Sequence, residues 1–180
     1  MHMRKGINTG NGSRVVFILI LLLPGIFTMP GCGVYSFTGA SIPPGARTIS
    51  IDYFPNNALL VQPTLSQRFT DALRDKFTGE TSLNLVRENG DMSIEGEIVG
   101  YSANPIAIQG NEQAALNRLT ITVKVRFVNH LDEKMNYEQS FSRFQDYDSS
   151  SSLADVEDDL IDQINRDLVQ DIFDKAVVNW

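Results

Sequence analysis

The side chain with the most distinctive chemistry is Cys32, the single cysteine in 180 residues. One thiol cannot form a disulfide within its own chain, so the fold must hold without one. Residues 15–27, VVFILILLLPGIF, carry no charge and precede it, and a basic segment comes before them. A basic start followed by a short apolar run is typical of a secretory signal. The run is too short to span a bilayer, which takes about 20 apolar residues. We therefore predict that residues 1–31 are a lipoprotein signal peptide that is removed.

The residues around Cys32 favour lipid attachment. Gly31 directly before the cysteine is typical of bacterial lipoprotein signals, although Pro30 is an unusual member of that box. We expect acyl chains on Cys32 and no other cofactor; two or more chains hold a protein stably on a bilayer. Gly33, in place of aspartate, favours sorting to the outer membrane, so the expected location is its periplasmic face. The alternatives for Cys32 are a free thiol, or an ordinary secretory signal after which the cysteine is left over. The alternative for the apolar run is a buried helix.

The acidic balance of the chain limits its partners. The formal net charge is −7. Removal of residues 1–31 takes away three basic side chains and no acidic one, which leaves 12 basic against 22 acidic groups, a charge of −10. Affinity for nucleic acid depends on Lys and Arg neutralising phosphates. We therefore expect no nucleic-acid partner, and any anionic ligand requires a local basic patch.

The sequence contains no recognisable catalytic or metal-binding motif. His2 lies in the predicted signal and His130 in a predicted turn. Serines occur outside G-x-S-x-G, and phosphate-loop and zinc motifs are absent from the sequence. Asp146 and Asp148 in DYDSSSS could suggest calcium, but the segment lacks the glycine and closing glutamate of an EF-hand, and the acids that follow suit the start of a helix. We expect neither an enzyme nor a metal site.

One basic stripe is suggestive. Arg118, Lys124 and Arg126 stand at even spacing in a strongly alternating stretch, RLTITVKVRFV, and even spacing places strand side chains on one face. This stripe could hold the phosphates of an anionic lipid while acyl chains meet the partly apolar loop at 103–117. The alternative is ion pairing with Glu95 and Glu97, which share the outward face of the preceding strand.

Hydrophobic periodicity predicts the elements that position these residues. Strands are expected at 48–54, 83–86, 92–102, 118–128 and 135–144, with helices at 64–77 and after Ser152 to the end of the chain. In the first strand Ile49, Ile51 and Tyr53 should face inward, Gly79 should close the first helix, and Tyr101 should face outward. Residues 32–47 are interpreted as a lipidated tether and 48–180 as one domain. The predicted fold is α+β, with two helices on one face of a small mixed or antiparallel sheet of four to five strands.

The ordered set of segments resembles the LptE family of lipopolysaccharide-assembly lipoproteins. The resemblance rests on CGVYSF after the signal, on RLTITVKVRFVN and YEQSFSRFQDYD, and on the closing LADVEDDLIDQINRDLVQDIFDKAVVNW. It covers nearly the whole chain from Cys32 to Trp180.

The resemblance implies a role in lipopolysaccharide transport. A member of this family is expected to lie in the lumen of an outer-membrane barrel, LptD, as plug and assembly partner, and to bind lipopolysaccharide through basic residues near a strand end. Arg118, Lys124 and Arg126 are the candidates for that contact. A barrel lumen is polar, which suits a partner with a polar strand face and a covered apolar surface. The alternative is a stand-alone periplasmic lipid-binding or adaptor lipoprotein.

Overall fold

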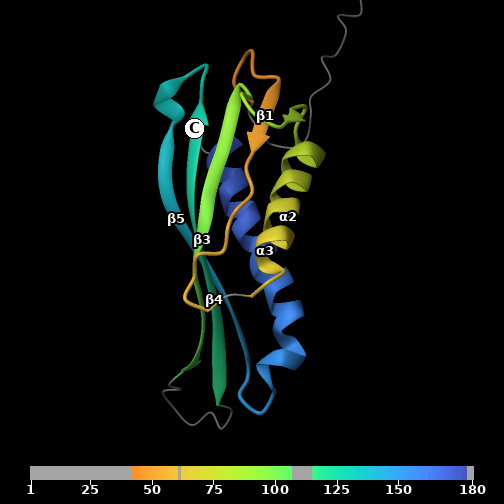
Figure 1. Cartoon of the computed structure of the whole chain (residues 1–180), viewed down its shortest axis with the longest axis vertical. Helices are drawn as coiled ribbons and strands as arrows, with labels where there is room; N and C mark the ends of the chain where they lie inside the picture. The colour runs from red at the N-terminus through yellow and green to blue at the C-terminus, as the bar shows by residue number, and fades with distance from the viewer. Residues whose placement is uncertain (1–41, 61, 107–114, 178–180) are drawn as a thin grey trace, which may run out of the picture. The chain divides into compact units, whose positions relative to one another are not determined.

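The computed structural model describes residues 42–60, 62–106 and 115–177 as a five-stranded sheet with two helices on one face (Figure 1). The predicted α+β fold is thereby confirmed. Cys32 and the predicted signal lie outside the described residues, so the domain boundaries at 31 and 47 stay predictions. The elements in chain order are β1 (Thr48–Ile51), α2 (Leu65–Glu80), β2 (Asn84–Val86), β3 (Met92–Ile106), β4 (Leu116–Asn129), the 3₁₀ helix η2 (Glu133–Met135), β5 (Tyr137–Asp148) and α3 (Leu153–Val177).

The sheet combines a parallel half and an antiparallel half. Its strand order is β2-β1-β3-β4-β5, and β1 runs parallel to both of its neighbours. Parallel pairing requires a crossover connection, which α2 supplies between β1 and β2. The pairs β3–β4 and β4–β5 are antiparallel. Helix α3 packs over β4 and β5, and α2 lies beside β1 and β2.

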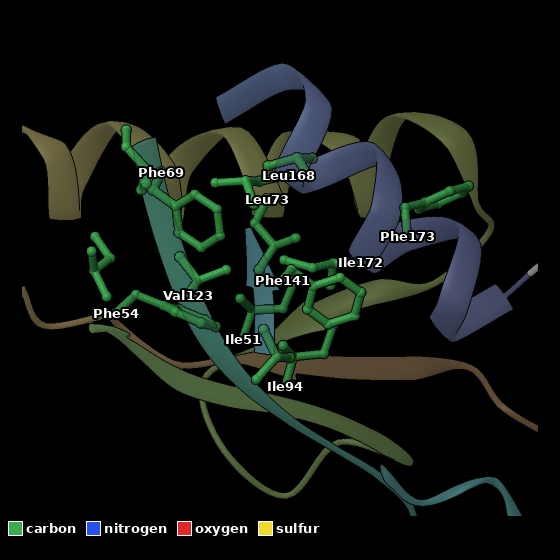
Figure 2. Packing of buried hydrophobic residues seen from close by; sticks show 14 of the residues in the cluster. Ile51, Phe54, Phe69, Leu73, Ile94, Val123, Phe141, Leu168, Ile172 and Phe173 are labelled. Carbon is green, nitrogen blue, oxygen red and sulfur yellow. The ribbon is translucent and has the colours of Figure 1, made fainter. Parts of the chain in front are cut away.

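The hydrophobic core fills the space between the sheet and the two helices (Figure 2). Its strand contribution comes from alternate residues, most regularly in β4, and its helix contribution from the apolar stripes of α2 and α3. Two edge-to-face aromatic pairs fasten it: Phe54 on Phe69, and Phe77 of α2 on Phe173 of α3, each with ring centroids 5.1 Å apart. Such pairs stabilise the folded state beyond what the burial of their apolar area contributes. Neither helix of the described residues is long and apolar enough to traverse a bilayer.

Polar contacts set the direction of one helix against the other. Arg68 in α2 contacts Asp158 (2.6 Å) and Asp162 (2.5 Å) of α3, and Lys76, two turns later, donates to Gln170 Oε1 (2.6 Å). Because later residues of α2 meet later residues of α3, the two helices run in the same direction.

Two expectations near β1 and α2 were wrong. Tyr53 is 51% exposed and Phe54 takes its place in the core, because β1 ends at Ile51 and the alternation is broken. The Phe54 N–H donates to Thr70 Oγ1 (3.1 Å), which joins this segment to α2. Gly79 does not close α2; the helix continues to Glu80, and the N–H of Thr81 bonds to the Phe77 carbonyl.

The far half of β3 also differs from expectation. A bulge between Ile98 and Gly100 shifts the register against β4. An extra residue in one strand reverses which side chains face inward, so Tyr101 is buried and its hydroxyl donates to Glu157 of α3. Burial, and then the hydrogen bond to Glu157, raise the pKa of Tyr101. The loop expected at 103–117 is shorter, because β3 continues to Ile106 and β4 begins at Leu116; residues 107–114 lie outside the described residues.

Asp91 ties the entry of the chain into the domain to the start of β3. Its Oδ2 accepts hydrogen bonds from the N–H groups of Arg47 (2.9 Å) and Thr48 (3.0 Å) and from the Thr48 hydroxyl (2.9 Å). Its carbonyl accepts from the N–H of His130 (2.9 Å) in the β4–β5 connection. The N–H of Arg47 first, and then the Thr48 hydroxyl, lower the pKa of Asp91 because they stabilise the carboxylate.

We predict that Asp91→Asn lowers the unfolding temperature at neutral pH, because the amide removes the charge that these donors stabilise. The pKa of Asp91 is lower in the folded chain than its ordinary value of 3.8. Its stabilisation is therefore present above about pH 4 and is lost as the pH falls through the folded pKa. Thermal melts by circular dichroism from about pH 7 to pH 2 should show the wild type and the variant converging in acid.

Asp75→Asn is the matched control, because the exposed Asp75 carboxylate makes no hydrogen bond within the described residues. A difference between Asp91→Asn and the wild type that stays constant over the whole pH range would contradict this account.

Candidate functional site

The sheet face turned away from the helices is polar, and we call it the open face. It is formed by alternate residues of β3, β4 and β5: Glu95, Glu97, Arg118, Thr120, Thr122, Lys124, Arg126, Glu138, Ser140, Ser142, Phe144 and Asp146. In β4 these alternate with five apolar residues that are 0% exposed, from Leu119 to Phe127. The helices therefore cover the apolar side of β4, and Arg118, Lys124 and Arg126 share the outward side as predicted.

Each cation of the basic stripe has a carboxylate partner. Arg126 Nη1 lies 2.7 Å from Glu95 Oε1, which confirms one pair of the ion-pairing alternative. The other two cations pair with β5. Lys124 Nζ lies 2.5 Å from Glu138 Oε1, a diagonal neighbour, while the residue directly opposite Lys124 is Ser140. Arg118 holds Asp146 with two hydrogen bonds, Nε to Oδ1 (2.7 Å) and Nη2 to Oδ2 (2.9 Å).

Two of these pairs, Lys124 with Glu138 and Arg118 with Asp146, favour the charged forms of their members. The ammonium of Lys124 lowers the pKa of Glu138, and Glu138 in turn raises the pKa of Lys124. The guanidinium of Arg118 lowers the pKa of Asp146. Exposed ion pairs of this kind contribute little to folding because water and salt screen them. Their main consequence is that the stripe is electrically compensated at neutral pH.

The two ends of the open face differ in character. Near β1 there is a hollow of about 380 Å³, lined on its charged side by Asp52, Glu95, Glu97, Lys124, Arg126 and Glu138. Four carboxylates against two cations do not favour a phosphate there. At the opposite end Arg118 lies over the ring of Phe144, 3.6 Å from its centroid. Between the two ends the face is neutral, and Thr122 bonds Ser142 across the strands (2.9 Å).

Sequence reasoning missed the β5 contribution to this face. Glu138, Asp146 and the half-exposed Phe144 lie at even spacing in β5, so their common face could have been found from the alternation of that strand. Their pairing with Lys124 and Arg118 could not, because it depends on the register between β4 and β5. Tyr53 was missed because it was expected inside.

Other residues singled out in the sequence do not join this site. His130 lies in the β4–β5 connection, where its backbone N–H bonds Asp91. Asp148 accepts a hydrogen bond from the N–H of Ser150 (2.7 Å), as a turn residue does. Within the described ranges, no group of three or more His, Cys, Asp or Glu side chains could hold a metal ion. The predicted lipidation of Cys32 lies outside the described residues.

Similar folds occur among solved structures. A hypothetical protein from Chlamydia trachomatis aligns with a TM-score of 0.50 at 9% identity, over 74% of this chain and 99% of that one. Uncharacterized lipoprotein B from Nitrosomonas europaea aligns with a TM-score of 0.48 at 16% identity, over 79% and 88% of the two chains. A minor lipoprotein from Acinetobacter baumannii aligns with a TM-score of 0.44 at 14% identity, over 71% and 90%. Of these three, the Chlamydia match alone reaches a TM-score of 0.50, and at 9% identity it concerns the fold only.

A family assignment comes from the sequence. No curated protein gives a significant match. Residues 46–176 match the model of the LptE lipopolysaccharide-assembly family, and this span runs from the entry of the chain into the domain almost to the end of α3. The match therefore includes every strand that the structure describes, the whole of α2, and all of α3 except its last residue. The chain belongs to the LptE lipopolysaccharide-assembly family.

Proposed function

We propose that this protein is an outer-membrane lipoprotein that acts as plug and assembly partner of an LptD-type barrel in lipopolysaccharide transport. In this proposal acyl chains on Cys32 hold the domain at the periplasmic face of the outer membrane, and the open face lies against the polar inner wall of the barrel. The role requires no catalysis. It rests on membership of the LptE family and on the chemistry of one surface.

The observation that carries the proposal is the compensated open face. A plug must expose polar groups to a polar lumen while its own apolar surface stays covered. On this chain the helices cover the apolar side of β4, and the opposite side offers hydroxyls together with charges of both signs. Such a surface can exchange hydrogen bonds with a wall of mixed polarity.

The decisive experiment is co-purification from native membranes in detergent, followed by mass spectrometry. We expect a barrel protein at a fixed ratio with the wild type, and much less of it with Ser142→Trp, because an indole at the centre of the open face holds the two surfaces apart. Ser82→Trp, at an exposed serine between α2 and β2, is the matched control and should keep the barrel. Purification of the wild type without any barrel would instead support a stand-alone adaptor lipoprotein.

The lipid anchor is tested separately. Cys32→Ala should move the protein from the membrane fraction to the wash, because the acyl chains would have lost their attachment point. Its circular dichroism spectrum and unfolding temperature should remain those of the wild type, because the core of the described residues forms without that sulfur. Retention of Cys32→Ala on membranes in high salt would show that lipid on this cysteine is not the anchor.

Direct binding of lipopolysaccharide is a second candidate role. It is favoured by the placement of Arg118, Lys124 and Arg126 on one exposed face, and opposed by their ion pairs, because a phosphate would have to displace three carboxylates. Exposed ion pairs are weak, so a phosphate group can compete with these carboxylates for the three cations.

We expect the triple variant Arg118→Gln, Lys124→Gln, Arg126→Gln to bind lipopolysaccharide more weakly than the wild type in a pull-down with purified lipid. Its unfolding temperature should change by no more than about 3 °C, as expected when exposed charges are removed. Lys134→Gln with Arg166→Gln removes two exposed cations elsewhere and should leave binding unchanged. Equal binding by the triple variant and the wild type would leave the stripe as surface ion pairs only.

A further inference from the structure

A second hollow lies at the β2 edge of the sheet, and it shares Asp52 and Tyr53 with the hollow near β1. It has a volume of about 410 Å³, and we call it the edge pocket. Its lining includes Ile51 and Tyr53 from the end of β1, Arg74 from α2, and Leu85 and Arg87 from β2 and the residue after it. The volume is within the range of small-ligand and side-chain pockets. Tyr53 is 51% exposed and Leu85 42% exposed, so the pocket has apolar walls open to solvent.

The edge pocket forms because β2 ends before β1 does, which leaves the end of β1 without a neighbouring strand on that side. It pairs with Thr48, Ile49 and Ser50 of β1 and ends there. Beyond this point the carbonyl of Ile51 accepts hydrogen bonds from Arg74 Nε (3.2 Å) and Nη2 (2.8 Å). A guanidinium therefore takes the place of the next strand residue, and this brings a positive charge into the floor of the pocket.

The cations of the edge pocket are not neutralised. Of the twelve basic side chains in the described residues, six form ion pairs with carboxylates, and Arg47, Lys134, Arg166 and Lys175, which lie outside the pocket, form none. Arg74 forms none, and Arg87 has no partner of any kind among the described residues. The one carboxylate in the lining is Asp52, and it makes no ion pair with either arginine within that part of the chain. The lining of the edge pocket therefore combines two arginines that make no ion pair with a single carboxylate.

The neighbouring backbone can also make hydrogen bonds. The N–H of Asn84 points toward β1, where it donates to the Arg47 carbonyl (2.8 Å). Successive residues of a strand direct their backbone groups to opposite sides, so Leu85 presents its N–H and carbonyl to the free edge. An added strand could therefore pair with β2 while one of its side chains enters the pocket.

We propose that the edge pocket binds an extended segment of a partner protein that carries an acidic side chain. The segment pairs with the edge of β2, its carboxylate meets the guanidinium groups of Arg74 and Arg87, and an apolar side chain two residues away, on the same face of the segment, lies on Leu85 and Tyr53. Guanidinium suits this role because its fork of N–H donors matches a carboxylate. The residues of this chain that precede β1 are not complementary, because the first acidic residue of the sequence is Asp52.

The test is a double-mutant cycle on the full-length chain purified in detergent. The probes are two fluorescent capped hexapeptides, Val-Thr-Glu-Thr-Val-Thr and the same peptide with glutamine for glutamate, and anisotropy gives the Kd. We expect the glutamate peptide to bind with a Kd below about 1 mM, and the glutamine peptide about 5- to 10-fold more weakly. Arg87→Gln should weaken the glutamate peptide by a similar factor and leave the glutamine peptide unchanged, because the two groups act as a pair.

The controls make each outcome decisive. Arg87 is exposed and has no described partner, so its replacement preserves the fold, and Arg166→Gln removes an exposed arginine of α3 and should change neither Kd. The proposal is overturned if the two peptides bind equally, if Arg87→Gln weakens both alike, or if neither binds at about 5 mM. The peptide test is independent of the barrel test with Ser142→Trp. Ser142 lies on the open face and outside the edge pocket, so the two proposals can fail separately.

Discussion

The structure depends on one constraint: the sheet can bury only one of its faces. The apolar stripes of α2 and α3 run over the same side, and all five inward residues of β4 from Leu119 to Phe127 lie beneath them with no exposed surface. Burial of these side chains is the main favourable term in folding. Because no helix of the described residues covers the opposite side, the residues there must be compatible with water or with a polar partner. The polarity of the open face follows from the placement of the core.

Charge on this surface is arranged locally. The chain is strongly acidic, yet the cations of the open face each meet a carboxylate from a neighbouring strand. These carboxylates come from β3 and β5, on the two sides of β4, so charges of both signs are interspersed on this face. A surface of this kind gains little stability from its ion pairs, but it keeps a regular display of donors and acceptors. That combination suits a lasting contact with a polar wall better than capture of a polyanion.

The two edges of the sheet, at β5 and at β2, make different contacts with the helices. At β5, Arg143 reaches α3 and holds Asp171 with two hydrogen bonds of 2.6 and 2.5 Å, which fastens the outer strand to the helix layer. At β2 the strand stops early, and Arg74 completes the hydrogen bonding of the Ile51 carbonyl instead. Exposed strand edges are usually short or protected, because they can template unwanted pairing. The short β2 is consistent with that rule, while the neighbouring hollow leaves room for a specific partner.

Most of the architecture could be predicted from the sequence, because strand alternation and helical periodicity are local properties of the chain. The two helices, the outward placement of Arg118, Lys124 and Arg126, and the burial of Leu119 to Phe127 all follow from spacing alone. Tertiary structure decided what spacing cannot express. The bulge after Ile98 brought Tyr101 inside, the early end of β1 exchanged Tyr53 for Phe54, and the register between β4 and β5 gave Lys124 and Arg118 their partners. Each of these depends on how separate segments meet, and a periodic pattern contains no information about register.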